Sequence, residues 1–107
     1  MDMQKMDMQK IMKDAENMQK SLLQAQEELE RMEIKGSSSG DLVEIWMNGQ
    51  AELKNIKIKS DVVNPNDVET LEDLILSAFK DAHNKAASVS KDTISKYTMG
   101  LGFGPMQ

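Results

Sequence analysis

A regular alternation of apolar and polar positions marks the N-terminal third of the chain. Apolar side chains recur there at spacings that alternate between three and four residues, at Met8, Ile11, Ala15, Met18, Leu22, Ala25, Leu29 and Met32. Mostly Gln, Glu, Lys, Asp and Asn lie between them, and no Gly or Pro occurs before Gly36. The pattern predicts an amphipathic helix from about Asp2 to Glu33, roughly 45 Å long. Its 3.5-residue period is typical of a helix that packs against another long helix.

The middle of the chain has the composition of β-strands. Residues 42–47 are rich in β-branched and aromatic side chains, and Asn48-Gly49 after them is a candidate two-residue type I′ turn. On the returning strand the apolar positions change from odd to even near Lys54-Asn55, which predicts a β-bulge. Such a turn and bulge would place Leu42, Trp46, Ala51, Leu53, Ile56 and Ile58 on one face, and Val43, Ile45 and Met47 on the other.

This hairpin, with a short strand near Ile34, predicts an antiparallel sheet of about three strands over residues 34–59. Both of its faces would carry apolar side chains, whereas one layer of helices covers only one face. We therefore expect a second copy of the chain to cover the other face in a homodimer. The candidate core and dimer residues are Val43, Ile45, Trp46, Met47, Leu53, Ile56 and Ile58.

A second helix is predicted over residues 64–96. The segment Asn64-Pro65-Asn66-Asp67 is typical of a helix N-terminus, and apolar residues then keep a helical spacing with no breaker until Gly100. Residues 97–107 contain three Gly and one Pro and are predicted to form a flexible tail. The chain is thus expected to be a single α+β domain spanning residues 1–107, with the first helix over residues 1–33.

Composition excludes several classes of protein. The chain has no Cys, which excludes disulfides and thiolate metal sites. No apolar run resembles a signal peptide or a membrane span, so we expect a cytosolic protein without membrane insertion. The net charge of −5 opposes binding to nucleic acid unless the positive charge is segregated.

The charge is indeed uneven along both predicted helices. Residues 1–20 carry four Lys against four acidic residues, whereas residues 21–33 carry one Arg against four Glu. Residues 64–83 carry one Lys against five acidic residues, whereas residues 84–107 carry three Lys against one Asp. In an antiparallel pair of helices, the start of the first and the end of the second would meet far from the sheet. The candidate DNA contacts are Lys5, Lys10, Lys13, Lys20, Lys85, Lys91 and Lys96.

Little in the sequence indicates catalysis. The only histidine, His83, has no partners at catalytic or metal-ligand spacing, so it is interpreted as a surface or helix-packing residue. Glu69, Glu72 and Asp73 are explained by the preference for acids near the start of a helix. We therefore expect no enzyme activity, metal, cofactor or small-molecule substrate.

Four segments in this order resemble the YbaB/EbfC family of bacterial nucleoid-associated proteins. They are LERMEIKG at 29–36, LVEIWMNG at 42–49, ELKNIKI at 52–58 and DVETLEDLI at 67–75. The resemblance covers nearly the whole chain. It implies a homodimer with a central antiparallel sheet from which long helices project like tweezers, and binding to duplex DNA in the nucleoid. It also implies a link to DNA organisation, gene regulation or recombinational repair.

Two functions remain open on the sequence alone. The first is binding of duplex DNA with little sequence preference, because phosphate contacts position a protein without specifying bases. The second is a coiled-coil module that captures another protein and has no direct role on DNA. The salt dependence of binding distinguishes the two functions. Affinity that rests on phosphate contacts falls steeply as the salt concentration rises, whereas affinity that rests on burial of an apolar seam does not.

Overall fold

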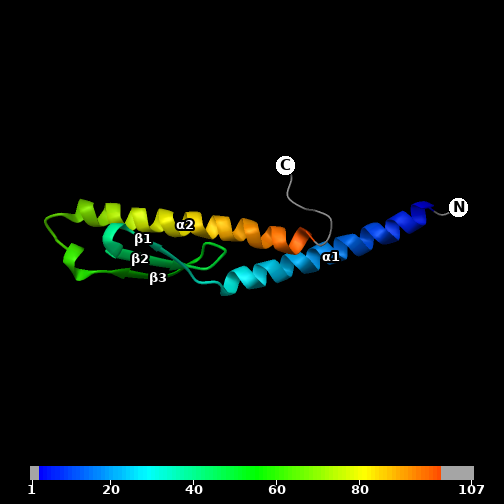
Figure 1. Ribbon diagram of the computed structural model, residues 1–107, viewed down its shortest axis with the longest axis horizontal. Helices are drawn as coiled ribbons and strands as arrows, with labels where there is room; N and C mark the ends of the chain where they lie inside the picture. Colours follow the sequence, from blue (N-terminus) through cyan, green and yellow to red (C-terminus); the bar gives the residue numbers. More distant parts are fainter. Residues whose placement is uncertain (1–2, 100–107) are drawn as a thin grey trace.

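The computed structural model describes residues 3–99 (Figure 1). In chain order its elements are α1 (Met3–Arg31), β1 (Ile34–Ser37), β2 (Val43–Met47), β3 (Leu53–Ile58) and α2 (Val68–Met99). Short 3-10 helices, Ser39–Asp41 and Ser60–Val62, precede β2 and follow β3. The strands form one antiparallel sheet in the order β1-β2-β3. The predicted α+β class, with a long helix at each end of a three-stranded sheet, is confirmed.

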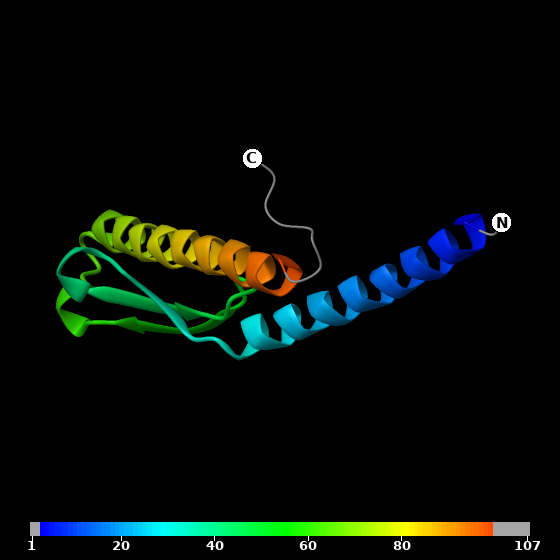
Figure 2. The same cartoon turned by 45° about the vertical axis from the view of Figure 1, so that its right-hand side comes forward.

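The molecule is elongated, with extents of 80 × 26 × 16 Å. α2 lies along one face of the sheet, and α1 leaves the end of the sheet and projects away from it (Figures 1 and 2). α1 and α2 run in opposite directions, and α2 ends beside α1 well before the N-terminus of α1 is reached. The first helix therefore extends beyond everything that could pack on it within residues 3–99.

The core lies between the sheet and α2. Val43, Ile45 and Met47 of β2 are fully buried against the small side chains of Ala78 and Ala82. At Gly36 of β1 a Cβ atom would collide with the backbone of these two alanines. The sequence thus uses alanine on the helix and glycine on the strand to let the two backbones approach closely.

The turn between β2 and β3 differs from the prediction. Five residues, Asn48–Glu52, separate the paired ends of the strands, and Ala51 rather than Gly49 has a positive φ, of 64°. The Asn48 side chain is fully buried and its oxygen accepts the backbone N–H groups of Gln50 at 2.9 Å and Glu52 at 3.0 Å. Tertiary contacts of Asn48 therefore override the two-residue turn that Asn-Gly favours.

The longer turn also corrects the predicted faces of the sheet. The bulge is confirmed, because Trp46 pairs with Asn55 and Met47 with Leu53, which leaves Lys54 unpaired. The loop, however, has three residues more than a two-residue turn, and an odd shift exchanges the two faces of a strand. Residues that pair across strands share a face. The register therefore places Leu53, Ile56 and Ile58 on the face of Met47, Ile45 and Val43, respectively.

The ends of α2 differ from the predicted 64–96. Asp67 caps the helix, since its carboxylate accepts the backbone N–H of Thr70 at 3.3 Å and the Thr70 hydroxyl at 2.7 Å. Asn64 instead stabilises the preceding turn by accepting the N–H of Asn66. At the other end the helix continues to Met99, so the predicted tail starts too early at Tyr97. The remainder of that tail, residues 100–107, lies outside the described residues.

Candidate nucleic-acid interface

The N-terminal part of α1, residues 3–24, is called the arm below. The apolar track of α1 is buried only in its second half, where Ala25 is 0% and Leu29 3% exposed. In the arm, Met8 and Ile11 of the same track are 63% and 65% exposed, and Met12 beside them is 63% exposed. The heptad pattern therefore continues far beyond the part that α2 covers.

A second track runs along the opposite side of α1. Residues at the c and f positions of the heptad, when the apolar positions are a and d, face away from the apolar track. In this chain those positions are Lys10, Lys13, Asn17, Lys20, Gln24, Glu27 and Arg31. We call Lys10, Lys13, Lys20 and Arg31 the basic track. All four are exposed, and within residues 3–99 none of them forms an ion pair.

Of the lysines predicted as DNA contacts, Lys10, Lys13 and Lys20 therefore lie on one exposed face. Lys5 belongs to α1, but its side chain lies outside the described part of the structure. Arg31 was missed by the sequence reasoning because the second half of α1 is acidic overall. A heptad assignment of the charged positions would have found it.

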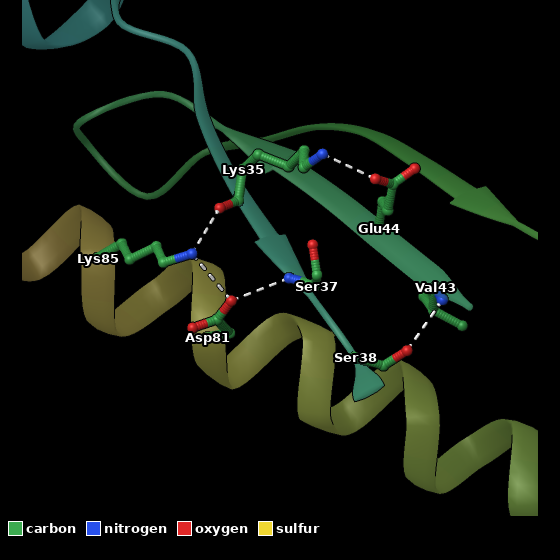
Figure 3. A network of polar contacts seen from close by, with 7 residues as sticks. All are labelled: Lys35, Ser37, Ser38, Val43, Glu44, Asp81 and Lys85. Atoms are coloured by element: carbon green, nitrogen blue, oxygen red, sulfur yellow. Dashed lines mark hydrogen bonds and ion pairs between the residues drawn. The ribbon is translucent and has the colours of Figure 1, made fainter. Parts of the chain in front are cut away.

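Lys85 is held by the body of the protein. Its ammonium group donates to the Asp81 carboxylate at 3.1 Å and to the carbonyl of Lys35 at 3.2 Å (Figure 3). Asp81 also accepts the backbone N–H of Ser37 at 2.9 Å, and this bond, followed by the one from Lys85, lowers the pKa of Asp81. Lys85 thus joins α2 to β1, which is a structural role.

Lys96 is engaged at the crossing of the two long helices. It donates to both oxygens of Glu28, at 3.2 and 3.0 Å, and the Tyr97 hydroxyl donates to the same carboxylate at 2.7 Å. The bond from Tyr97, and then that from Lys96, lowers the pKa of Glu28. The bond to Glu28 raises the pKa of Lys96 and that of Tyr97. We call these three residues the clasp.

The clasp corrects the predicted meeting of the less acidic helix ends. The end of α2 reaches Glu28, in the acidic half of α1, rather than the lysine-bearing start of the helix. Lys91 is exposed and, within the described part of the chain, forms no ion pair. Lys85 and Lys96 thus neutralise carboxylates of the protein itself, whereas the basic track of α1 is exposed and, within residues 3–99, forms no ion pair.

The remaining candidates for chemistry lie apart from one another. His83 is exposed and stacks on Phe79, with 5.9 Å between ring centres. Glu69, Glu72 and Asp73 are exposed on the first turns of α2. Within residues 3–99 no group of three or more His, Asp or Glu residues is arranged to hold a metal ion. No helix among the described residues is both long and apolar enough to cross a membrane.

Comparison with solved structures supports the fold. The chain resembles the crystal structure of the uncharacterized protein HP0035 from Helicobacter pylori, with a TM-score of 0.63 and 23% sequence identity. The similarity covers 73% of this chain and 90% of that one. At this level of identity it shows a shared fold.

Comparison with protein sequences identifies the family. A nucleoid-associated protein of Corynebacterium glutamicum strain R is 41% identical over 96 residues, which are 90% of this chain and 93% of the relative. One of Ruminiclostridium cellulolyticum is 45% identical over 95 residues, or 89% and 83% of the two chains. LL0120 of Lactococcus lactis is 39% identical over 98 residues, or 92% and 99%. The profile of the YbaB/EbfC DNA-binding family matches residues 3–101. The chain therefore belongs to the YbaB/EbfC DNA-binding family.

Proposed function

We propose that this protein is a cytoplasmic, nucleoid-associated homodimer that binds duplex DNA with little sequence preference. The observation that carries the proposal is the basic track on the exposed arm. Lys10, Lys13 and Lys20 project from a helix that stands clear of an acidic body. Phosphate contacts by a few such side chains give weak binding without base readout, with dissociation constants of about 10⁻⁴ to 10⁻⁶ M at physiological salt.

Segregation of charge is what allows an acidic chain to bind DNA. Two acidic groups between the arm and the middle of α2 are neutralised, since Lys96 pairs with Glu28 and Lys85 with Asp81. The arm lies beyond both pairs, and its three lysines share one side of the helix. A duplex can therefore contact the arm while its phosphates stay away from the carboxylates of α2.

The salt dependence of DNA binding tests this proposal. Each phosphate contact contributes about −0.9 to the slope of log K against log salt. In the variant Lys10→Gln, Lys13→Gln, Lys20→Gln we expect weaker binding of a duplex and a slope shallower by roughly 3 per protomer that contacts DNA. Glutamine keeps the helix propensity high, so the fold is retained.

A matched control removes an exposed lysine elsewhere. Lys80 lies two residues after Ala78, about 200° around α2 and therefore away from the sheet. Lys80→Gln should leave the slope unchanged, and Lys13→Gln alone should reduce it by about 1. Equal slopes for the wild-type protein and the triple variant would contradict binding through the arm.

The proposed homodimer rests on the apolar surface that α2 leaves open. On β3, Leu53 is 56% and Ile56 41% exposed, although both lie on the face that α2 covers at β1 and β2. Phe79, 39% exposed, stacks on His83, and His83 lines a hollow with the loop that precedes β3. One side of the molecule, formed by β3 and the neighbouring flank of α2, thus presents apolar side chains. Two copies related by a two-fold axis would bury this same surface against each other.

The mass in solution tests the dimer. We expect twice the 12.0 kDa of one chain for the wild-type protein and one chain for Ile56→Asp, because a carboxylate would be buried at the contact. Val63→Asp is the matched control, since Val63 is 59% exposed outside this surface and its variant should stay dimeric. A wild-type mass of one chain would contradict the dimer.

A protein-interaction module is the second candidate function. The exposed apolar residues of the arm favour it, because Met8 and Ile11 continue a heptad pattern suited to another helix and Met12 lies beside them. Binding of a helical partner there would persist at moderate salt, whereas duplex binding would not. The basic and the apolar track lie on opposite sides of α1, so different substitutions should affect the two functions. Ile11→Glu should weaken binding of a helical partner, and Lys13→Gln should weaken binding of a duplex.

A further inference from the structure

The face of the sheet turned away from α2 differs from the core face. Because Val43, Ile45 and Met47 point towards α2, the alternating Glu44 and Trp46 point away from it. Cross-strand pairing adds the neighbours of these two residues to the same face. We call this set the outer face, and its members are Lys35, Ser37, Glu44, Trp46, Asn55 and Lys57. Within residues 3–99 no helix packs over it (Figures 1 and 2).

Trp46 lies at the centre of the outer face. Lys35 of β1 pairs with it on one side and Asn55 of β3 on the other. The indole is half-buried, so part of a large planar apolar group lies in contact with water among polar neighbours. An aromatic ring on an open sheet face can receive another planar ring by stacking.

The charge around Trp46 is positive. Lys35 pairs with Glu44 at 2.8 Å, and Figure 3 shows both side chains on the side of the sheet away from α2. The bond from Lys35 lowers the pKa of Glu44, and the nearby charges of Lys57 and Lys59 lower it further. Three ammonium groups, of Lys35, Lys57 and Lys59, thus lie near the carboxylates of Glu44 and Asp41, on a chain whose net charge is −5. The excess of one positive charge suits an anionic ligand.

We infer that the outer face binds single-stranded DNA, with an unpaired base stacked on Trp46 and the flanking phosphates at Lys57 and Lys59. A strand offers both parts of this ligand, a planar base and a phosphate on each side of it. A duplex does not, because its bases are already paired and stacked. Aromatic side chains beside a positively charged groove are the features by which proteins bind single strands without sequence preference. This site is separate from the arm and does not depend on duplex binding there.

The emission of Trp46 reports directly on the site, because it is the only tryptophan in the chain. We would titrate the full chain with a short oligothymidine, whose bases do not pair with one another. Saturable quenching of the emission is the expected result, while a duplex of equal length leaves the emission unchanged. Unaltered emission at saturating oligothymidine, or equal quenching by the duplex, would overturn the inference.

Variants separate stacking from charge. Stacking of one base contributes roughly 1–3 kcal/mol, so Trp46→Ala should weaken the binding of a labelled oligothymidine about 5- to 150-fold, and Trp46→Phe by much less. The double variant Lys57→Glu, Lys59→Glu should also bind oligothymidine more weakly. It keeps Trp46, so its binding can still be followed by the tryptophan emission. Lys80→Glu on α2 is the charge-matched control and should bind as the wild-type protein does. Binding that is unchanged in Trp46→Ala overturns the inference.

Two further measurements keep the outcomes distinct. Circular dichroism establishes whether Trp46→Ala retains the fold; if it does not, the Lys57→Glu, Lys59→Glu variant decides alone. The arm variant Lys10→Gln, Lys13→Gln, Lys20→Gln should keep the quenching by oligothymidine while it loses duplex binding. Loss of both in the arm variant would place single strands on the arm instead and overturn the outer-face site.

Discussion

The body of the molecule, made of the sheet and α2, differs from the arm of α1 in how far its side chains are buried. In the body, Val43, Ile45 and Met47 are fully buried, and the side chain of Asn48 beside them forms four hydrogen bonds. In the arm, every described side chain from residue 7 to residue 24 is exposed or half-buried. Most helical stability in proteins comes from tertiary packing of an apolar face, and the arm packs little of its own. The body can therefore fold on its own contacts, whereas the arm depends on what binds it.

The second half of α1, in which Ala25 and Leu29 are buried, joins the arm to the body. The backbone N–H of Gly49 donates to the carbonyl of Leu29 at 2.7 Å, and a Cβ at Gly49 would collide with Leu29. The amide of Asn48 donates to the carbonyl of Glu30 at 3.4 Å. Together with the clasp, these contacts determine the direction in which the arm leaves the body.

The largest effect is expected from a change inside the body. Gly36→Ala would place a methyl group against the backbone of α2, which cannot move aside as a side chain can. We expect a loss of about 3 kcal/mol in the free energy of unfolding, or a melting temperature lower by roughly 12–24 °C. Gly40→Ala is the control: Gly40 has a φ of +66°, but a Cβ there would meet only Leu42 Cγ, at an ordinary contact distance of 3.7 Å, so only about 1–2 kcal/mol should be lost. A smaller loss for Gly36→Ala than for Gly40→Ala would show that β1 and α2 are less closely packed.

A smaller loss is expected at the joint. Asn48→Ala removes an oxygen that accepts two backbone N–H groups and an amide that donates to the Glu52 carboxylate at 2.7 Å. Because these groups would be left unpaired in a buried position, the free energy of unfolding should fall by about 2 kcal/mol. The exposed Gln50, whose amide makes one bond of 3.4 Å, serves as the comparison, and Gln50→Ala should change stability by less than about 0.5 kcal/mol. Chemical denaturation measures both, and equal losses would rule out the role given to Asn48.

The smallest effect is expected at the clasp, and it depends on pH. The pKa of Glu28 is lowered by its bonds from Tyr97 and Lys96, so its contribution to stability is present above the ordinary carboxyl pKa and is lost as the pH falls through the lowered value. Glu28→Gln should therefore melt slightly below the wild-type protein at pH 7, and the gap should close in strongly acidic solution. The groups are partly exposed, which keeps the effect small. Glu27→Gln should show little change at either pH, and a gap for Glu28→Gln that widens in acid would contradict the clasp.

The predictable parts of the fold are those that local patterns control. The heptad of apolar residues indicates α1, and the switch from odd to even positions near Lys54 indicates the bulge. The turn at Asn48-Gly49 could not be predicted from its two residues, because both are used for tertiary contacts with the end of α1. This error in loop length reversed the predicted face of Leu53, Ile56 and Ile58.

For Lys85 and Lys96, too, the separation along the chain decides whether the ion-pair partner can be predicted from the sequence. The pairing of Lys85 with Asp81, four residues earlier on one helix, is visible in the sequence. The pairing of Lys96 with Glu28 joins residues 68 positions apart, and no local pattern indicates it. Assigning DNA contacts from the distribution of charge along the chain therefore included two lysines that bind carboxylates of the protein itself.

Hydrogen–deuterium exchange with and without duplex DNA tests most directly whether the arm is the DNA-binding element. Because the arm makes few contacts of its own, its amides should exchange quickly in the free protein, and a bound duplex should slow them. We predict protection over residues 3–24 of α1, with little change in β1, β2 and β3. Protection confined to the body, with the arm exchanging as fast as before, would contradict the account.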